Sequence, residues 1–216
     1  DVDYRHEKGE PTCYEPSSNE SHPNEPARCF TGSGPATWGH DWTKWGIQDL
    51  NGNVWEWDAG YRIVDGEIQV IPYNNAAMGS ECDMSVSSTL WKAIKADGSL
   101  VAPGTSGTLK YDWVSGKIQL TSGNVTYTTD QGNGCRYTDI TLATGLRAPE
   151  IAQMLLIYPD EPGKDYGGDY HWLNTRGERL PLCGGGWGDG TGAGVFYVFL
   201  GSPRSSVHWG IGFRSA

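Results

Sequence analysis

The chain has 216 residues and a formal net charge of -10, with no local cluster of lysine and arginine to offset it. This balance opposes binding to phosphate backbones and anionic lipid, so neither nucleic acid nor a membrane is expected as a partner. The length can bury a core in one large domain or two small ones. Glycine (31), tryptophan (10) and tyrosine (11) are abundant, which favours turns and aromatic packing over long helices.

The N-terminal segment, residues 1–37, is rich in Pro, Ser, Glu, Asn and Gly and has little apolar periodicity. It is predicted to be an irregular arm packed on the domain. From residue 61 to about 145 the pattern is that of strands. "RIVDGEIQV" alternates about Asp65-Gly66 and "YDWVSGKIQLT" about Ser115-Gly116, which predicts two hairpins with two-residue turns. "NVTYTTDQGNGCRYTDITL" continues the β-rich region with β-branched and aromatic residues.

One helix is predicted, in "RAPEIAQMLLIYP". Pro149 suits its first position, Glu150 its positive dipole end, and Pro159 should end it. Ile151, Leu155 and Ile157 are expected to face the core. An acidic, glycine-rich loop follows.

The last part of the chain is dominated by glycine, interrupted by the strand-like "GVFYVFL". Each glycine adds backbone entropy that folding must remove, so this segment cannot organise itself. A rigid neighbour is expected to hold it.

Three phrases carry a family signal: "WGIQDLNGNVWEWDAG", "GERLPLCGGGW" and the terminal "PRSSVHWGIGFRSA". Together they resemble the formylglycine-generating-enzyme/sulfatase-modifying branch of the C-type lectin fold. Within it they resemble the variable proteins of diversity-generating retroelements, especially phage-type ones. The resemblance implies an α+β, C-type lectin-like domain over residues 38–216, loop-rich with short strands and few helices. The "WGIQDLNGNVWEW" segment is expected to lie beside the terminal "GIGFRS" strand, with Trp55 and Phe213 in the core.

The turn "DLNGNVWEW" has two readings. Gly52 permits a left-handed backbone, and Asn51, Asn53 and Glu56 offer hard oxygen ligands. Similar turns in the formylglycine-generating enzymes hold calcium, so the resemblance implies a structural Ca²⁺ site here, with no cofactor otherwise required. In the alternative reading, Glu56 binds backbone amides and no metal is present.

Catalysis is not expected. The oxidase members of the family use a pair of cysteines near the C-terminus, whereas Cys183 stands alone after Cys135. The five cysteines are scattered and odd in number, which indicates neither a zinc site nor a disulfide framework, although Cys13 and Cys29 could form one pair. His171 and His208 are interpreted as solvent-facing loop histidines.

In retroelement variable proteins a terminal segment is rewritten at template adenines, so AAC codons become NNC. The candidate variable segment spans about 183–210, and each candidate position holds a residue that NNC encodes. These candidate positions are Gly186, Gly188, Asp189, Gly192, Phe199, Gly201, Ser202, Ser206, Val207, His208 and Gly210. Trp187 and Trp209 cannot arise from NNC, so they are expected to be fixed or to arise from other codons. Without the resemblance, the segment reads as an ordinary glycine-rich loop.

The resemblance implies a hypervariable binding face with Phe199, Val207 and His208 at an apolar centre and serines and Asp189 around it. Interleaved residues are expected to point inward, namely Ala193, Val195, Phe196, Val198, Leu200, Ile211 and Phe213. Arg204 and Arg214 are expected to be buried or semi-buried guanidiniums that tie loops together. The expected ligand is a protein or glycan receptor on a bacterial surface, and the expected setting is a phage virion, at the tail or surface, or else a bacterial cell surface. A homo-oligomer is compatible with this setting. The alternatives are a sulfatase-modifying-type oxidase and a non-variable decoration protein.

Overall fold

The computed structural model describes residues 14–16, 26–29, 31–32, 34–208 and 210–213. Its strands are β1 (Tyr14–Pro16), β2 (Pro26–Cys29), β3 (Trp55–Trp57), β4 (Tyr61–Val64), β5 (Glu67–Val70), β6 (Lys92–Ile94), β7 (Leu100–Val101), β8 (Lys110–Val114), β9 (Lys117–Thr121), β10 (Asn133–Arg136), β11 (Thr141–Leu142), β12 (Tyr170–Leu173), β13 (Glu178–Cys183), β14 (Val198–Ser202) and β15 (Ile211–Phe213). Its helices are η2 (Ala36–Trp38), η3 (Pro72–Glu81), η4 (Tyr137–Asp139), α1 (Glu150–Met154) and η5 (Gly190–Gly192). The fold is therefore loop-rich, with short strands and few helices, as predicted.

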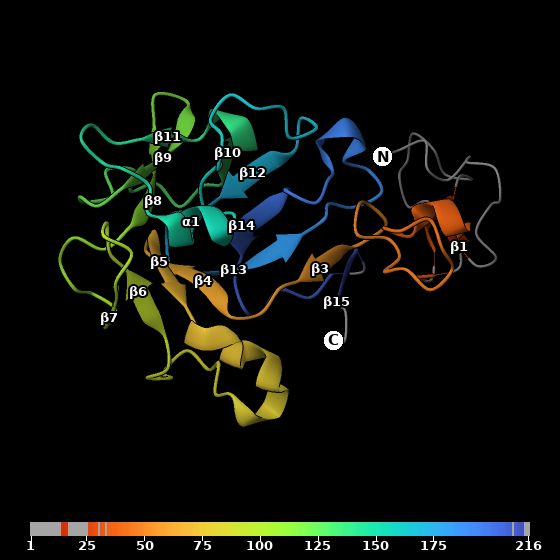
Figure 1. The fold of residues 1–216 in the computed structure, drawn as a ribbon, viewed down its shortest axis with the longest axis horizontal. Coiled ribbons are helices and arrows are strands. Elements are labelled where there is room, and N and C mark those ends of the chain that lie inside the picture. Colours follow the sequence, from red (N-terminus) through yellow and green to blue (C-terminus); the bar gives the residue numbers. More distant parts are fainter. Residues whose placement is uncertain (1–13, 17–25, 30, 33, 209, 214–216) are drawn as a thin grey trace.

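One 13-stranded sheet organises the chain, in the order β10-β12-β14-β13-β4-β5-β8-β9-β11. β3 pairs with both β13 and β15, and β6 and β7 extend from β5 (Figure 1). β3 and β15 run parallel with Trp55 opposite Ile211, which confirms the predicted pairing of these distant segments. Separately, β1 pairs with β2, so the arm predicted to be irregular contains a strand pair. Residues 1–13 and 17–25 of this arm are outside the described residues.

Both predicted hairpins are confirmed. Asp65 and Gly66 have φ of 46° and 80°, and Ser115 and Gly116 have 53° and 79°, the left-handed pair that a type I′ turn needs. The expected β-structure after them is only partly present, because residues 122–132 form no strand. Instead, the buried Asp112 carboxylate accepts the N–H groups of Thr126 and Tyr127, each at 2.9 Å, and so fixes this segment as a loop.

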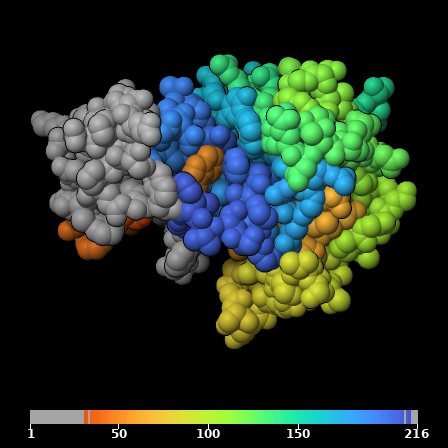
Figure 2. Space-filling view, turned by 180° about the vertical axis from the view of Figure 1, so that it is seen from behind, coloured from red at the N-terminus to blue at the C-terminus, as the bar shows by residue number. Residues whose placement is uncertain are grey.

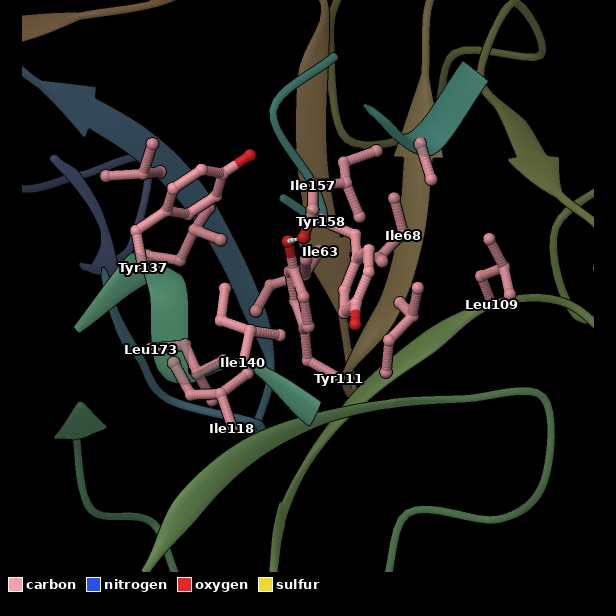
Figure 3. Packing of buried hydrophobic residues seen from close by; sticks show 14 of the residues in the cluster. Ile63, Ile68, Leu109, Tyr111, Ile118, Tyr137, Ile140, Ile157, Tyr158 and Leu173 are labelled. Atoms are coloured by element: carbon pink, nitrogen blue, oxygen red, sulfur yellow. Dashed lines mark hydrogen bonds between the residues drawn. The ribbon is translucent and has the colours of Figure 1, made fainter. Parts of the chain in front are cut away.

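The main core lies between the sheet and the segment formed by α1 and the residues after it, which contributes Ala152, Ile157 and Tyr158. The core includes Ile63, Ile68, Tyr111 and Ile118, all fully buried (Figure 3). Leu200 is fully buried in the same cluster. The Tyr111 hydroxyl donates to the Ile157 carbonyl at 2.7 Å, which satisfies the one polar group of that ring. Burial of large apolar side chains from distant parts of the chain is the main stabilising contribution here.

Helix α1 is shorter than predicted. It begins at Glu150, with Pro149 just before it, but ends at Met154 rather than near Pro159, and Leu156 has a left-handed φ of 56°. The chain turns back because the N–H of Ile157 donates to the carbonyl of Ala152 at 2.8 Å. Ile157 is thus fully buried and Ile151 packs against the core, but Leu155 is 45% exposed, so its predicted core position is wrong.

His171 is buried, and its interpretation as a solvent-facing histidine is wrong. It lies on β12 with 0% exposure, 5.4 Å from the Tyr111 ring and stacked at 6.2 Å on Tyr137. Neither ring nitrogen has a hydrogen-bond partner in the described part of the chain. Burial lowers the pKa of His171 from 6.5 to about 3, so the imidazole is neutral at physiological pH.

We therefore expect acid to destabilise the fold through His171. The unfolded chain takes up this proton below about pH 6.5 and the folded chain only near pH 3, so stability is complete above pH 6.5 and falls as pH falls towards 3. Between pH 7.5 and 4.5 the loss from this group is on the order of 2 to 3 kcal/mol. Urea unfolding of the chain and of His171→Phe should show that the variant loses this part of the pH dependence. An identical pH profile in the two proteins would contradict the prediction.

Candidate binding groove

The turn 50–55 holds the glycine-rich end of the chain. The N–H of Gly52 donates to the Gly184 carbonyl at 3.0 Å, that of Trp187 to the Asn53 carbonyl at 3.0 Å, and that of Trp55 to the Gly210 carbonyl at 2.9 Å. Gly52 has a φ of 77°, as its role in the turn requires. The turn is thus the rigid neighbour that the glycine-rich segment was expected to need.

The side chains of β12 and β14 alternate between the two faces of the sheet. His171 and Leu173 on β12, and Val198 and Leu200 on β14, are buried on the core side. Trp172 and Phe199 are half-buried on the opposite side, and they are neighbours in the parallel β12–β14 register.

The residues expected to point inward mostly do so. Ala193, Val198 and Leu200 are buried, and Phe196 packs against the core. Ile211 is half-buried and lines the groove described next, so its predicted inward position is wrong. Val195 is 54% exposed, so its predicted inward position is wrong. It lies in the turn before β14, where strand alternation does not apply. The Phe213 side chain is outside the described residues.

On this second face lies an open groove of about 870 Å³, between β3, β12, β14 and the segments 186–189 and 206–211. Figure 2 shows the segment near residue 50, in orange, between the blue atoms of the C-terminal part of the chain. The groove is lined by Trp55, Trp172, Leu182, Gly186, Trp187, Gly188, Asp189, Tyr197, Phe199, Ser202, Ser206, Val207, His208, Gly210 and Ile211.

Aromatic rings form much of this lining. The ring centroid of Trp55 lies 4.6 Å from that of Tyr197, edge to face, and 5.5 Å from that of Phe199. Phe199 in turn stacks on Trp172 at 6.5 Å with 12° between the planes. Trp55 is half-buried and lines the groove, so its predicted place in the core is wrong. Its partners come from β12 and β14, which the local sequence around the turn does not specify.

The polar groups of the groove come from its rim. One carboxylate oxygen of Asp189 accepts the N–H of Gly186 at 2.6 Å, and burial raises the pKa of Asp189 above its usual value. The Nδ1 atom of His208 accepts the N–H of Gly210 at 3.1 Å. Val207 is 95% exposed at the edge.

The structure brings nine of the eleven candidate variable positions into this one groove. The exceptions are Gly192, in η5, and Gly201, whose added Cβ would meet the ring of Phe199 at 2.5 Å. Gly186 and Gly210 line the groove but are buried, so they do not form the solvent-facing surface that was expected of them. Sequence reasoning missed Trp172 and Tyr197 as lining residues. The signal for Trp172 was the alternation in "DYHWLN".

Backbone conformation separates two kinds of glycine in this segment. Gly184, Gly185 and Gly190 have φ of 86°, 79° and 56°, which side chains rarely adopt, and we call them the framework glycines. None of the five candidate glycines is in that region: Gly186, Gly188, Gly192, Gly201 and Gly210. A Cβ at Gly188 or Gly192 would meet nothing within 4 Å, whereas one at Gly185 would lie 2.7 Å from the Cβ of Ala193.

The proposed calcium ligands are spread over the turn. Asn53 is buried with φ of 61°, Asn51 is exposed, and Glu56 is half-buried on β3. Within the described ranges no three His, Cys, Asp or Glu side chains group together as a metal site would require. The ligands expected here are mainly amide and backbone oxygens, so the calcium site stays a prediction.

Arg204 ties the loop after β14 to the sheet, as expected, but it is exposed, so its predicted buried or semi-buried position is wrong. Its side chain is 36% exposed and donates twice to Glu178 on β13, at 3.1 and 2.9 Å. Glu178 also accepts from the buried Arg62 at 2.7 Å. Arg214 and Trp209, and a pairing of Cys13 with Cys29, lie outside the described residues.

Comparison with known proteins adds no relative. No protein-family model matches the chain, and no curated protein matches its sequence. Among the helices that the structure describes, none has the length and apolar character needed to cross a bilayer.

Proposed function

We propose that this chain is a hypervariable ligand-binding protein, diversified by a retroelement, whose binding face is the groove. In this proposal residues 38–216 form a C-type lectin-like domain of the formylglycine-generating-enzyme type. The ligand is a receptor on a bacterial surface, and the setting is a phage virion or else a bacterial cell surface.

The observation that carries the proposal is the convergence of the candidate positions. An NNC codon can encode the residue at each of these positions, and all of them lie in the terminal segment. They are dispersed between residues 186 and 210. A binding partner contacts one continuous patch, so exchangeable positions must lie together. Nine of them line a single groove.

The glycine conformations support the same proposal. A diversified position must accept many side chains without a change of backbone. The five candidate glycines avoid the left-handed region, whereas the framework glycines of the same segment occupy it. The hydrogen bonds from the turn 50–55 hold the backbone while groove side chains change.

A pair of display libraries tests whether the groove is an exchangeable face. The first library places NNC codons at Gly188, Ser202, Ser206, Val207 and His208, and most members should resist protease, because surface changes usually shift stability by only about 0.5 kcal/mol. The second library, the control, places NNC codons at the framework glycines, Gly52 and Leu200, and few members should resist. Similar loss of folded members in both libraries would contradict the proposal.

Retroelement diversification has its own test in the genome. The proposal requires a reverse transcriptase gene near this one and a second copy of the terminal codons that differs at adenines. Sequencing the flanking DNA decides the matter. A lone gene without such a copy would favour the non-variable decoration protein.

The alternative of a sulfatase-modifying-type oxidase predicts a close pair of thiols. Cys135, His171, Val198 and Cys183 lie in one row across β10, β12, β14 and β13. Three strand spacings separate the two cysteines by about 14 Å, whereas cysteines that pair have Cα atoms at most about 7 Å apart. Cys82 is buried in the separate cluster with Trp91.

We therefore expect no copper-dependent oxidation of a sulfatase cysteine peptide. Mass spectrometry of the peptide after incubation with the protein and copper measures this. Formylglycine formation that Cys183→Ala abolishes would instead support the oxidase.

A further inference from the structure

Among the residues that the structure describes, the groove lining carries a carboxylate but no lysine or arginine. Asp189 supplies this carboxylate, and no other described lining residue has one. One oxygen of Asp189 is engaged by the Gly186 N–H at 2.6 Å, and the other oxygen receives no hydrogen bond from the described residues. The formal net charge of the whole chain, -10, has the same sign. An incoming group of positive charge is therefore favoured both locally and at long range.

Aromatic faces stand beside this carboxylate. Gly186, whose N–H holds Asp189, would place a Cβ 3.3 Å from the Trp55 indole, so the carboxylate and this ring belong to one corner of the groove. Tyr197 and Phe199 lie against the same indole, at 4.6 and 5.5 Å. The negative face of an aromatic ring attracts ammonium and guanidinium groups, most strongly at tryptophan and where water is partly excluded.

We propose that the groove receives a lysine or arginine side chain of a protein partner, with its charged end at Asp189 and its apolar stem along the aromatic rings. This inference rests on the proposed function, because it names the ligand chemistry of the same groove. Leu182, Val207 and Ile211 supply apolar contact for the methylene stem. Asp189 is a candidate variable position, so it is also the residue that selects the charge of the partner.

Partial burial of Asp189 explains why a cation is preferred over a neutral sugar. The carboxylate has lost part of its hydration, and neither lysine nor arginine lies among the described residues that line the groove. A cation restores that lost interaction, whereas a sugar hydroxyl offers only a neutral hydrogen bond.

Three probes distinguish the ligand classes: a blocked Gly-Arg-Gly-Arg-Gly peptide, its glutamate counterpart, and a β-1,4-linked tetramer of N-acetylglucosamine. Each is titrated into the ¹⁵N-tryptophan-labelled chain, and the indole N–H signals of Trp55, Trp172 and Trp187 are followed, with assignment by single Trp→Phe variants. The arginine peptide should shift these signals saturably, and the other two should not. Asp189→Asn should weaken the arginine peptide at least 10-fold. Glu81→Gln, which removes the same charge from an exposed site on η3, is the matched control and should leave its affinity unchanged.

Each contrary outcome is informative. Equal weakening in both variants would mean attraction to net charge alone and would overturn the proposal. Binding of the sugar tetramer in place of the arginine peptide would also overturn it, but would leave a ligand-binding groove and so the proposed function. If no probe shifts the indole signals, the cation proposal fails, and the libraries and the flanking DNA still decide the function independently.

Discussion

Replacing Glu178 by alanine should destabilise the domain by about 3 to 5 kcal/mol, because it leaves a buried charge without its partner. The Arg62 side chain is 6% exposed and donates to Glu178 at 2.7 Å. Its guanidinium also stacks over the Trp91 ring at 4.2 Å, so it cannot leave the interior without giving up that contact. Arg204 loses its anchor at the same time, which should loosen the loop beside Ser206 and Val207. Urea unfolding at neutral pH measures the loss.

Two further proteins control this prediction. Asp139→Ala removes the carboxylate from an exposed pair with Lys117 at 3.5 Å and should cost less than about 1 kcal/mol. The double variant Arg62→Met, Glu178→Gln should be more stable than Glu178→Ala, because no buried charge is stranded. If Glu178→Ala is as mild as Asp139→Ala, the buried pair does not support the fold.

Leu200→Ala should cost about 3 kcal/mol, within the range of 2 to 5 for a fully buried leucine. Leu200 is 0% exposed on β14, in the main core cluster, and the strand beside it carries the buried His171. The groove residue Phe199 is its neighbour on the same strand, so loss of core packing should also disturb the aromatic rings of the groove. Thermal and urea unfolding measure the change.

The matched control is Val207→Ala, in the same terminal segment. Val207 is 95% exposed, and its truncation should change stability by less than about 0.5 kcal/mol. A similar cost for both substitutions would show that the terminal segment does not divide into a fixed core side and an exchangeable groove side.

The two hairpin turns followed from neighbouring residues alone. Asp65-Gly66 and Ser115-Gly116 predicted their turns because the required left-handed conformation is a property of those two residues. The inward positions of Val198 and Leu200 and the outward position of Phe199, in contrast, were expected from the family resemblance, and the alternation of side chains along β14 agrees with them. The pairing of the "WGIQDLNGNVWEW" segment with the terminal "GIGFRS" segment was likewise expected with the resemblance as guide.

Other features depended on partners far away in the sequence. "RAPEIAQMLLIYP" carries a helical pattern past Met154, but the helix ends there and Ile157 reaches the core through a turn. His171 looks like a loop histidine until β12 is placed between β10 and β14, where the Tyr111 and Tyr137 rings enclose it. Trp55 reads as a core residue until Tyr197 and Phe199 are seen beside it at the groove.

The sequence by itself determined the two hairpin turns, because they depend on residue type and local spacing, whereas the candidate positions came from the family resemblance. Only the tertiary structure decided which side chains are buried and that nine candidate positions share one groove. Burial and proximity depend on strands that meet from distant parts of the chain, such as β3 with β15 and β12 with β14. The secondary-structure preference of one segment cannot encode those contacts, because the free energy of packing depends on both of the segments that meet.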